Sequence, residues 1–285
     1  MKYLTVLPMV LLLTVSVISG QARCELIGTF VSIQPQVEFV RRVGGDGVTI
    51  EVLLGQGQNP HSFDPSPRTV ARLGEASLFF RAGVPYEERL VDSLAELFEG
   101  LVIIETSAGI RLRSIEHGHG HGDDPHTWLA PSLAKVHATN ICRGLEVARP
   151  EDRQRYRNGL SVYLAELDSL DREIGRLLKP YRGRSVYVYH PSFGYFLDAY
   201  GLHQVAVEHG GHEPSARMLA ELIEHMRDAG VRTLFVQPEF PSPVADALSQ
   251  ALGCKVVRLD PLATDYISNM RETARQVAEA LARQD

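Results

Sequence analysis

The chain has 285 residues, of which 44% are hydrophobic and 22% are charged, and its formal net charge at pH 7 is −6. These values are typical of an ordinary globular protein that is long enough for two domains with cores of their own. The acidic balance gives no sign of the basic surface that nucleic-acid binding requires, so we expect no nucleic-acid partner.

The chain begins with a segment that is typical of an export signal. Lys2 precedes a mostly apolar run from Leu4 to Ile18, and small and polar residues follow as far as Ala22. Because the run is too short and wrongly flanked to span a membrane, residues 1–22 are predicted to be a signal peptide cleaved after Ala22. An uncleaved membrane anchor is the alternative. The mature chain then has 28 basic and 35 acidic residues, a net charge of −7.

The three cysteines give weaker information. Cys24 lies just after the predicted cleavage site, where a thiol can be acylated, but Arg23 replaces the small residue that such processing favours. We therefore expect no lipid anchor on Cys24. An exported protein could join two of Cys24, Cys142 and Cys254 in a disulfide, but their spacing assigns no pair and matches no metal or redox motif. Structural roles are expected for all three.

Beyond the leader, short β-branched runs alternate with segments of helical periodicity, which predicts a parallel sheet with flanking helices. The predicted strands are Leu26–Ile33, Val48–Leu54, Ser77–Arg81 and Leu101–Glu105. The predicted helices lie around Val37–Val43, Pro67–Gly74 and Tyr86–Phe98.

A long helix is predicted over residues 150–181. Pro150 and the two acidic residues after it suit a helix start, and Pro180 with Gly183 marks the end. Apolar residues recur at helical spacing and form a stripe roughly 45 Å long at a rise of 1.5 Å per residue. The stripe consists of Tyr156, Leu160, Tyr163, Leu164, Leu167, Leu170, Ile174 and Leu177. An ordinary amphipathic helix or a coiled coil would show the same stripe, but the βα series on both sides favour a rod that packs against two lobes.

A second series of strands and helices follows the long helix. Its predicted strands are Ser185–Tyr189, Gln204–Glu208, Thr233–Gln237 and Lys255–Leu259, with helices near Gly194–Tyr200, Ala216–Ala229 and Pro243–Leu252. We therefore predict an α/β fold of two lobes, each a mainly parallel four-stranded sheet with flanking helices, joined by one long rigid α-helix. The expected parts are a signal peptide (1–22), an N-terminal lobe (23–149), the linking helix (150–181) and a C-terminal lobe (182–285).

Four side chains that suit a metal ion follow predicted strands. Asn59-Pro60-His61 and Asp124-Pro125-His126 each present a histidine from a turn that proline stiffens. His190 and Asp260 directly follow the first and last strands of the second series. Because open α/β sheets bind ligands beyond the carboxyl ends of their strands, we expect one shared site in the cleft between the lobes. Three imidazoles and a carboxylate suit a divalent transition metal.

Each of these residues also has a simpler explanation. A histidine at a strand end is more often a satisfied loop or core residue. Asp260, which precedes Pro261, could start a turn or cap a helix. The coincidence of all four at strand ends favours joint metal ligation.

The motifs NPHSF (59–63), DPHTW (124–128), YHPSFGYF (189–196), EPS (213–215) and LDPL (259–262) resemble those of the metal-specific solute-binding proteins of ABC importers. This class has a long linking helix and feeds zinc or manganese permeases, and the resemblance covers essentially the whole mature chain. It implies that His61, His126 and His190 are nitrogen ligands and that Asp260 is the oxygen ligand. It also implies a periplasmic monomer that delivers its ion to an ABC permease of the inner membrane and catalyses no reaction.

Zinc is the expected cargo. Three imidazoles and one carboxylate suit tetrahedral Zn²⁺, whereas Mn²⁺ prefers more oxygen ligands and a higher coordination number. In the family that the chain resembles, manganese members tend to carry glutamate at the position of His190. A manganese-binding member of the same class is the alternative. The family often has Glu-Pro where this chain has Gln237-Pro238, and Cys254 has no second cysteine in its lobe for the disulfide of many zinc members.

A short histidine-rich segment precedes the second Asx-Pro-His motif. His117, His119 and His121 alternate with glycine, which gives mobile imidazoles that could hold zinc weakly. Zinc members of the resembling family carry a longer loop of this kind at this point. We expect an auxiliary role in metal capture, and a solvated loop without function is the alternative.

Other functions fit the sequence less well. An exported zinc hydrolase would need an open coordination position and a general base, whereas this chain has no HExxH-type helix and a fourth ligand is predicted. A surface-displayed adhesin is harder to exclude, because binding proteins of this build can be displayed on cells. A lipid anchor on Cys24 would favour this function, but Arg23 argues against such an anchor. Long-helix binders of haem or siderophores share the architecture, but they do not need three histidines and an aspartate at strand ends.

Overall fold

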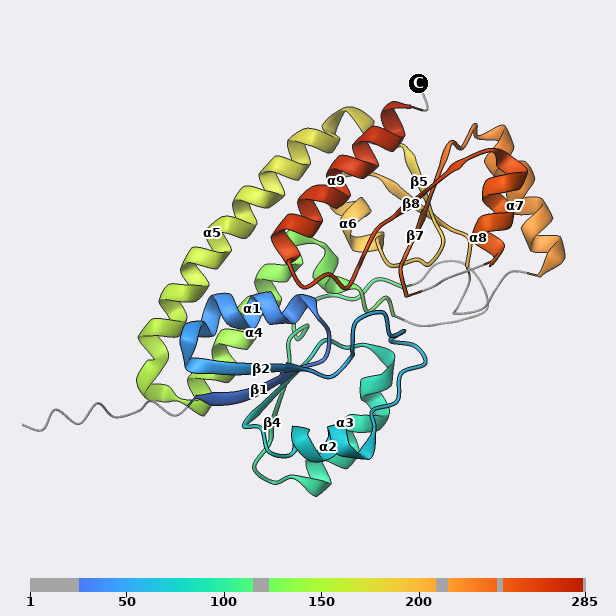
Figure 1. Ribbon diagram of the computed structural model, residues 1–285. Coiled ribbons are helices and arrows are strands. Elements are labelled where there is room, and N and C mark those ends of the chain that lie inside the picture. Colours follow the sequence, from blue (N-terminus) through green and yellow to red (C-terminus); the bar gives the residue numbers. More distant parts are fainter. Residues whose placement is uncertain (1–25, 115–122, 209–214, 240–242, 284–285) are drawn as a thin grey trace, which may run out of the picture.

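The computed structural model describes residues 26–114, 123–208, 215–239 and 243–283, and it confirms the predicted α/β fold of two parallel four-stranded sheets with flanking helices (Figure 1). The predicted signal peptide and Cys24 lie outside these residues, as do His117, His119 and His121. Among the helices of the described ranges, none combines the length and the apolar character that crossing a membrane requires.

The N-terminal sheet has the strand order β2-β1-β3-β4, and all of its neighbouring strands are parallel. Its strands are β1 (Ile27–Val31), β2 (Val48–Val52), β3 (Leu78–Arg81) and β4 (Val102–Glu105). The helices between them are α1 (Pro35–Gly44), α2 (Pro67–Leu73) and α3 (Pro85–Leu97). All three helices begin with proline, whose fixed φ and missing N–H suit the first turn. The predicted elements are all present, with ends that differ by one or two residues.

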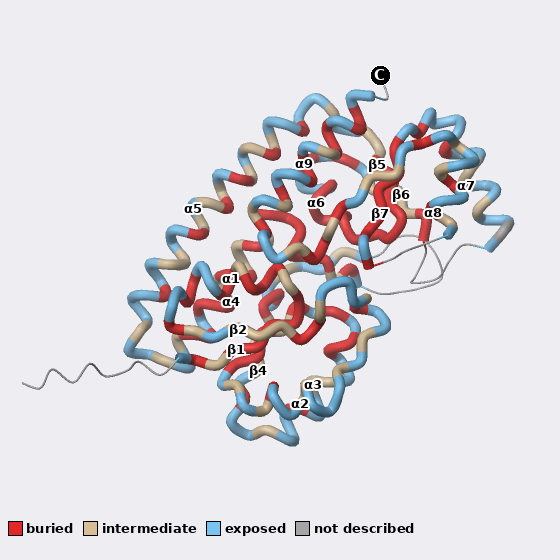
Figure 2. The backbone as a smooth tube through the Cα atoms, viewed as in Figure 1, coloured by how far each residue is buried: buried red, intermediate tan, exposed pale blue. Residues whose placement is uncertain are grey.

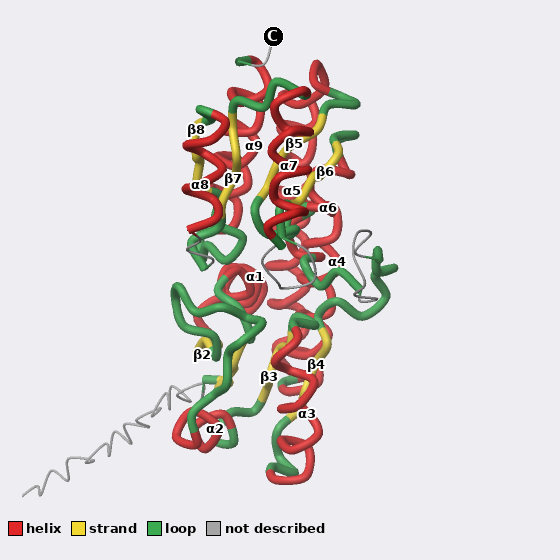
Figure 3. The backbone as a smooth tube through the Cα atoms, turned by 90° about the vertical axis from the view of Figure 1, so that its right-hand side faces the viewer, coloured by secondary structure: helices red, strands yellow, loops and turns green. Residues whose placement is uncertain are grey.

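The C-terminal sheet repeats this topology with the order β6-β5-β7-β8, again with parallel neighbours. Its strands are β5 (Ser185–Val188), β6 (His203–Ala206), β7 (Thr233–Val236) and β8 (Lys255–Arg258). Its helices are α6 (Gly194–Ala199), α7 (Ala216–Asp228) and α8 (Pro243–Leu252). Figure 3 shows the two lobes one above the other, with α1 near the junction.

The sequence analysis missed two helices, α4 (Pro131–Ala148) and α9 (Tyr266–Ala282). Both carry many polar residues, which masks a regular pattern of buried positions three or four residues apart. In α4 these positions include Ala134, Ala138, Ile141 and Leu145, and in α9 they include Met270, Ala274, Val277 and Leu281. The spacing would have identified both as amphipathic helices.

The long helix α5 (Arg153–Leu178) lies between a 3₁₀ turn at Pro150–Asp152 and another at Lys179–Tyr181. It packs against α1 and α4 of the N-terminal lobe and against α9 of the C-terminal lobe, so it contacts both lobes as predicted (Figure 1). Gly159 allows a close approach to α1, because a Cβ there would lie 2.7 Å from the carbonyl oxygens of Arg42 and Val43.

The apolar stripe on α5 is confirmed for most of its members. Its fully buried residues are Tyr156, Tyr163, Leu167, Leu170, Ile174 and Leu178. The prediction was wrong for Leu177, which is 40% exposed, because Leu178 lies four residues after Ile174 and continues the buried face.

One apolar core runs through both lobes and along α5, as Figure 2 shows by the buried positions that continue across the junction. A smaller cluster lies in the C-terminal lobe between the sheet and the helices α7 and α8. The predicted division of the chain into lobes and linking helix at residues 149–150 and 181–182 therefore stays a prediction.

Cys142 and Cys254 are both buried and free, so no disulfide joins these two.

Candidate metal centre

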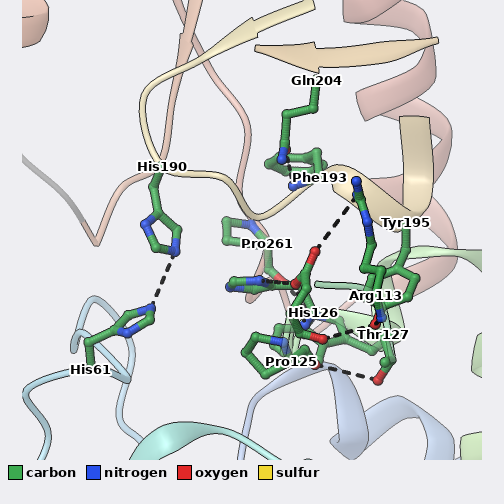
Figure 4. A network of polar contacts seen from close by, with 12 residues as sticks. His61, Arg113, Pro125, His126, Thr127, His190, Phe193, Tyr195, Gln204 and Pro261 are labelled. Atoms are coloured by element: carbon green, nitrogen blue, oxygen red, sulfur yellow. Dashed lines mark hydrogen bonds and ion pairs between the residues drawn. The ribbon is translucent and has the colours of Figure 1, made fainter. Parts of the chain in front are cut away.

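Three of the four predicted ligands come together between the lobes. His61 lies in the loop from β2 to α2, His126 precedes the 3₁₀ turn Thr127–Leu129, and His190 is the second residue after β5. One ring nitrogen of each imidazole lies within 4.8 Å of those of the other two. Figure 4 shows His61 and His190 pointing toward one another, with their Nε2 atoms 3.3 Å apart.

The spacing of these nitrogens suits a tetrahedral ion. Two nitrogens that each bind zinc at about 2.05 Å lie about 3.4 Å apart on such an ion. The 3.3 Å between the Nε2 atoms of His61 and His190 matches this edge, and the ring of His126 lies with its centroid 5.3 Å from that of His190.

The two Asx-Pro-His motifs fold into the same local turn. The side-chain oxygen of Asn59 accepts a hydrogen bond from the backbone N–H of His61 at 2.8 Å. The Oδ1 atom of Asp124 does the same for the N–H of His126 at 3.0 Å. The Asx side chain and the fixed φ of proline together explain why both motifs present an imidazole from a stiff loop.

Buried carboxylates orient two of the imidazoles. Asp124 Oδ1 lies 2.8 Å from Nδ1 of His126, and Glu208 Oε2 lies 3.0 Å from Nδ1 of His190. A neutral histidine that donates from Nδ1 to a carboxylate keeps the lone pair of Nε2 for the ion. The sequence analysis missed both carboxylates, although Asp124 belongs to a motif that it singled out.

The local environment also keeps His61 and His190 neutral. Burial, together with the nearby His190 and His126, lowers the pKa of His61 from 6.5 to about 3. Burial likewise lowers the pKa of His190, against the opposing effect of Glu208. At neutral pH these imidazoles are unprotonated and available as ligands.

The histidines line a cavity with a free volume of about 10 Å³, which is room for one ion or one water molecule. The other lining residues are Pro60, Val84, Pro85, Pro125, Trp128, Glu239, Pro261 and Leu262. The cavity is therefore far too small for haem or a siderophore, which need pockets of hundreds of cubic ångströms.

The fourth predicted ligand, Asp260, is not among the cavity-lining residues. Its Oδ1 atom accepts a hydrogen bond from the N–H of Leu262 at 2.7 Å, so Asp260-Pro261-Leu262 forms a third turn of the Asx-Pro kind. This is the turn-forming role that the sequence left open for Asp260. Its role as a metal ligand stays a prediction.

Glu239, which the sequence analysis missed, lines the cavity instead. It is 7% exposed, lies three residues after the end of β7 and shares a hydrogen bond with the carboxyl group of Asp260. Burial and the nearby Asp260 raise the pKa of Glu239 to about 7, as expected for two carboxyl groups that share a proton. The signal in the sequence was its place directly after Gln237-Pro238, beyond the end of a predicted strand.

A polar network fixes the loop that carries His126. His137 on α4 lies 2.9 Å from the Thr127 hydroxyl and 2.8 Å from the Thr106 hydroxyl, and Thr106 also accepts from Gln36 Nε2. Since the Thr106 hydroxyl donates to the carbonyl of Arg81, Nδ1 of His137 is the donor in its contact with Thr106. His137 is therefore held within the lobe, and it anchors Thr127, the residue next to His126.

Contacts between the lobes surround the cavity. Trp128 Nε1 donates to the carbonyl of Pro261 at 2.8 Å, and the Tyr195 hydroxyl donates to the carbonyl of Asp124 at 3.0 Å. In the C-terminal lobe, Gln237 Oε1 accepts from the backbone N–H of His190 at 3.0 Å. Both lobes thus hold the histidine loops in place.

Residues 30–280 match the model of the family described as ZnuA, the zinc-uptake complex component A, periplasmic. The chain belongs to this family. The family is described as a component of zinc uptake rather than as an enzyme, which does not support the alternative of an exported hydrolase.

Individual proteins similar to this chain include zinc-binding and zinc-uptake proteins. The chain is 29% identical to the zinc-binding lipoprotein AdcA of Streptococcus pneumoniae over 85% of its length and 51% of that protein. It is 27% identical to the high-affinity zinc uptake system protein ZnuA of Bacillus subtilis over 86% of its length and 81% of that protein. A crystal structure of ZnuA, 34% identical, superimposes with a TM-score of 0.86 over 90% of this chain and 100% of the other. The chain spans about half the length of the AdcA relatives it matches.

Proposed function

We propose that this protein captures one Zn²⁺ ion between its lobes and delivers it to an ABC-type permease of the inner membrane. His61, His126 and His190 are the nitrogen ligands in this proposal, and Asp260 is the oxygen ligand. The observation that carries it is the convergence of three imidazole nitrogens within 4.8 Å at a cavity of ionic size. Membership of the zinc-uptake family and the names of the zinc-binding relatives AdcA and ZnuA support the choice of cargo.

The arrangement of the lobes supports capture with little change of overall shape. Because α5 packs against helices of both lobes, wide hinge opening would break a continuous core. Loading and release then require local movement of the Asx-Pro turns or small shifts of the lobes. Delivery to the permease would use exposed surfaces of the two lobes in a periplasmic, monomeric protein whose leader has been cleaved.

The proposal is tested by native mass spectrometry of the mature protein with equal concentrations of Zn²⁺ and Mn²⁺. One tightly held zinc per chain is expected, and it should be lost or weakened in a His190→Ala variant. His203→Ala, which removes an exposed histidine from the same lobe, is the matched control and should load as the unmodified protein does. Preference for manganese, or unaltered loading of the His190 variant, would contradict the proposal.

A further inference from the structure

The cavity wall contains a carboxylate oxygen with no hydrogen-bond partner. Glu239 is 7% exposed and lines the cavity with the three histidines, and its Oε2 atom is buried and unpaired among the described residues. A buried oxygen of this kind costs desolvation free energy unless a donor or a cation contacts it. The small free volume beside it has room for a single ion.

Asp260, by contrast, has partners for its carboxyl group. Its Oδ1 atom is used in the turn to Leu262, and the carboxyl group also shares the hydrogen bond with Glu239. In the two histidine turns, the proline and the histidine that follows it both line the cavity, and the histidine supplies the ligand atom. In the third turn this position is Leu262, which also lines the cavity and offers no ligand atom.

We infer that Glu239 is a further ligand of the metal ion, binding through Oε2, and that Asp260 holds its carboxyl group in position. This inference rests on the proposed function. The ion then has three imidazoles and two neighbouring carboxyl groups within reach, and zinc accepts an expansion from four to five ligands. The added oxygen matters more for Mn²⁺, which prefers oxygen ligands and higher coordination numbers, so Glu239 would also set the selectivity between the two ions.

The inference is tested by substituting Glu239→Gln, which keeps the shape and removes the charge. Zinc affinity, measured by competition with a chromophoric chelator, is expected to fall by at least about 10-fold, the lower bound for loss of a residue that supports a metal site. Manganese affinity should fall by a larger factor than zinc affinity. The visible absorption of bound Co²⁺ should change from a weak five-coordinate spectrum to a more intense four-coordinate one.

The control is Glu221→Gln, which removes one negative charge from an exposed position on α7 of the same lobe. It should leave both affinities and the Co²⁺ spectrum unchanged. Circular dichroism of each metal-free variant checks that the fold is intact. If Glu239→Gln does not fold, zinc-edge X-ray absorption of the unmodified protein decides instead, with five nitrogen and oxygen neighbours expected at the ion.

The outcomes separate the two proposals. If the unmodified protein binds no zinc, the proposed function fails. If it binds zinc, but Glu239→Gln leaves the affinities and the Co²⁺ spectrum unchanged, only the role of Glu239 is overturned. In that case, or if X-ray absorption finds four neighbours with one oxygen, Glu239 is a structural partner of Asp260.

Discussion

The two lobes share one sheet topology, but they present their side chains to the cavity in different ways. The C-terminal lobe presents His190 and Glu239 from the ends of β5 and β7, the two central strands of its sheet. The N-terminal lobe presents His61 and His126 from longer connections that follow its two edge strands, β2 and β4. A central strand fixes the residue that follows it directly, whereas a loop needs added contacts to hold an imidazole. The Asx-Pro turns and the network through His137 supply those contacts in the N-terminal lobe.

The largest effect is expected from removing one imidazole of each lobe in turn. His126→Ala and His190→Ala should each weaken zinc binding by roughly 100-fold or more, because about 10–16 kcal/mol of binding free energy is divided among about four ligands. Competition titration with a chelator measures both constants. Similar losses would show that the lobes contribute equally, and a loss confined to one variant would contradict a site shared between them.

Substitution of the carboxylates behind the imidazoles sharpens the comparison. Asp124→Asn and Glu208→Gln should weaken zinc binding by about 10-fold to 100-fold, the range for partners that orient metal-bound histidines. Asp124→Asn should have the larger effect, because Asp124 contacts both the ring and the backbone N–H of His126. The same titration tests this order. The reverse order would show that the loop of the N-terminal lobe does not depend on its turn.

The network of the N-terminal lobe predicts a dependence of stability on pH. Burial lowers the pKa of His137 from 6.5 to about 3, so the unfolded chain binds a proton that the folded protein excludes. The part of the unfolding free energy that this pKa difference contributes is fully present above pH 6.5. It is lost as the pH falls, by about 2 kcal/mol at pH 5. In His137→Leu this part of the loss should disappear.

Urea denaturation of the metal-free proteins at pH 7 and pH 5 gives the measurement. The difference between the losses of unfolding free energy in the two proteins removes the effect of His61, whose pKa is also lowered. An equal loss in both proteins would mean that His137 is protonated in the folded state.

The smallest effect is expected at the contact between the lobes. Trp128→Phe removes the hydrogen bond to the carbonyl of Pro261 and should cost about 0.5–1.5 kcal/mol of unfolding free energy. Leu129→Ile, at a neighbouring buried position, is the matched control for packing. A change in zinc affinity without a change in stability would show that this hydrogen bond does not stabilise the junction.

Much of this fold can be predicted from the sequence, because the patterns that indicate its strands and helices are local. Strand runs, proline at helix starts and the spacing of apolar residues from Tyr156 to Leu177 each act over a few residues, and they predicted the two sheets and the linking helix. Helices α4 and α9 were not predicted because polar residues such as Asn140 and Thr273, which are themselves buried, interrupt their apolar stripes. Burial of a polar residue depends on its partner, and the sequence does not name that partner.

The sequence by itself determined which imidazoles meet, because a histidine fixed after a strand end must lie at the edge where parallel strands finish. Only the tertiary structure decided what stands behind and beside them. Glu208 lies 18 residues from His190, and Gln36 lies 70 residues from Thr106, so their contacts arise from the packing of whole elements. The same packing places Glu239 at the cavity, while one oxygen of Asp260 accepts a hydrogen bond within its own turn. The position of each of these two carboxyl groups depends on the residues that surround both of them.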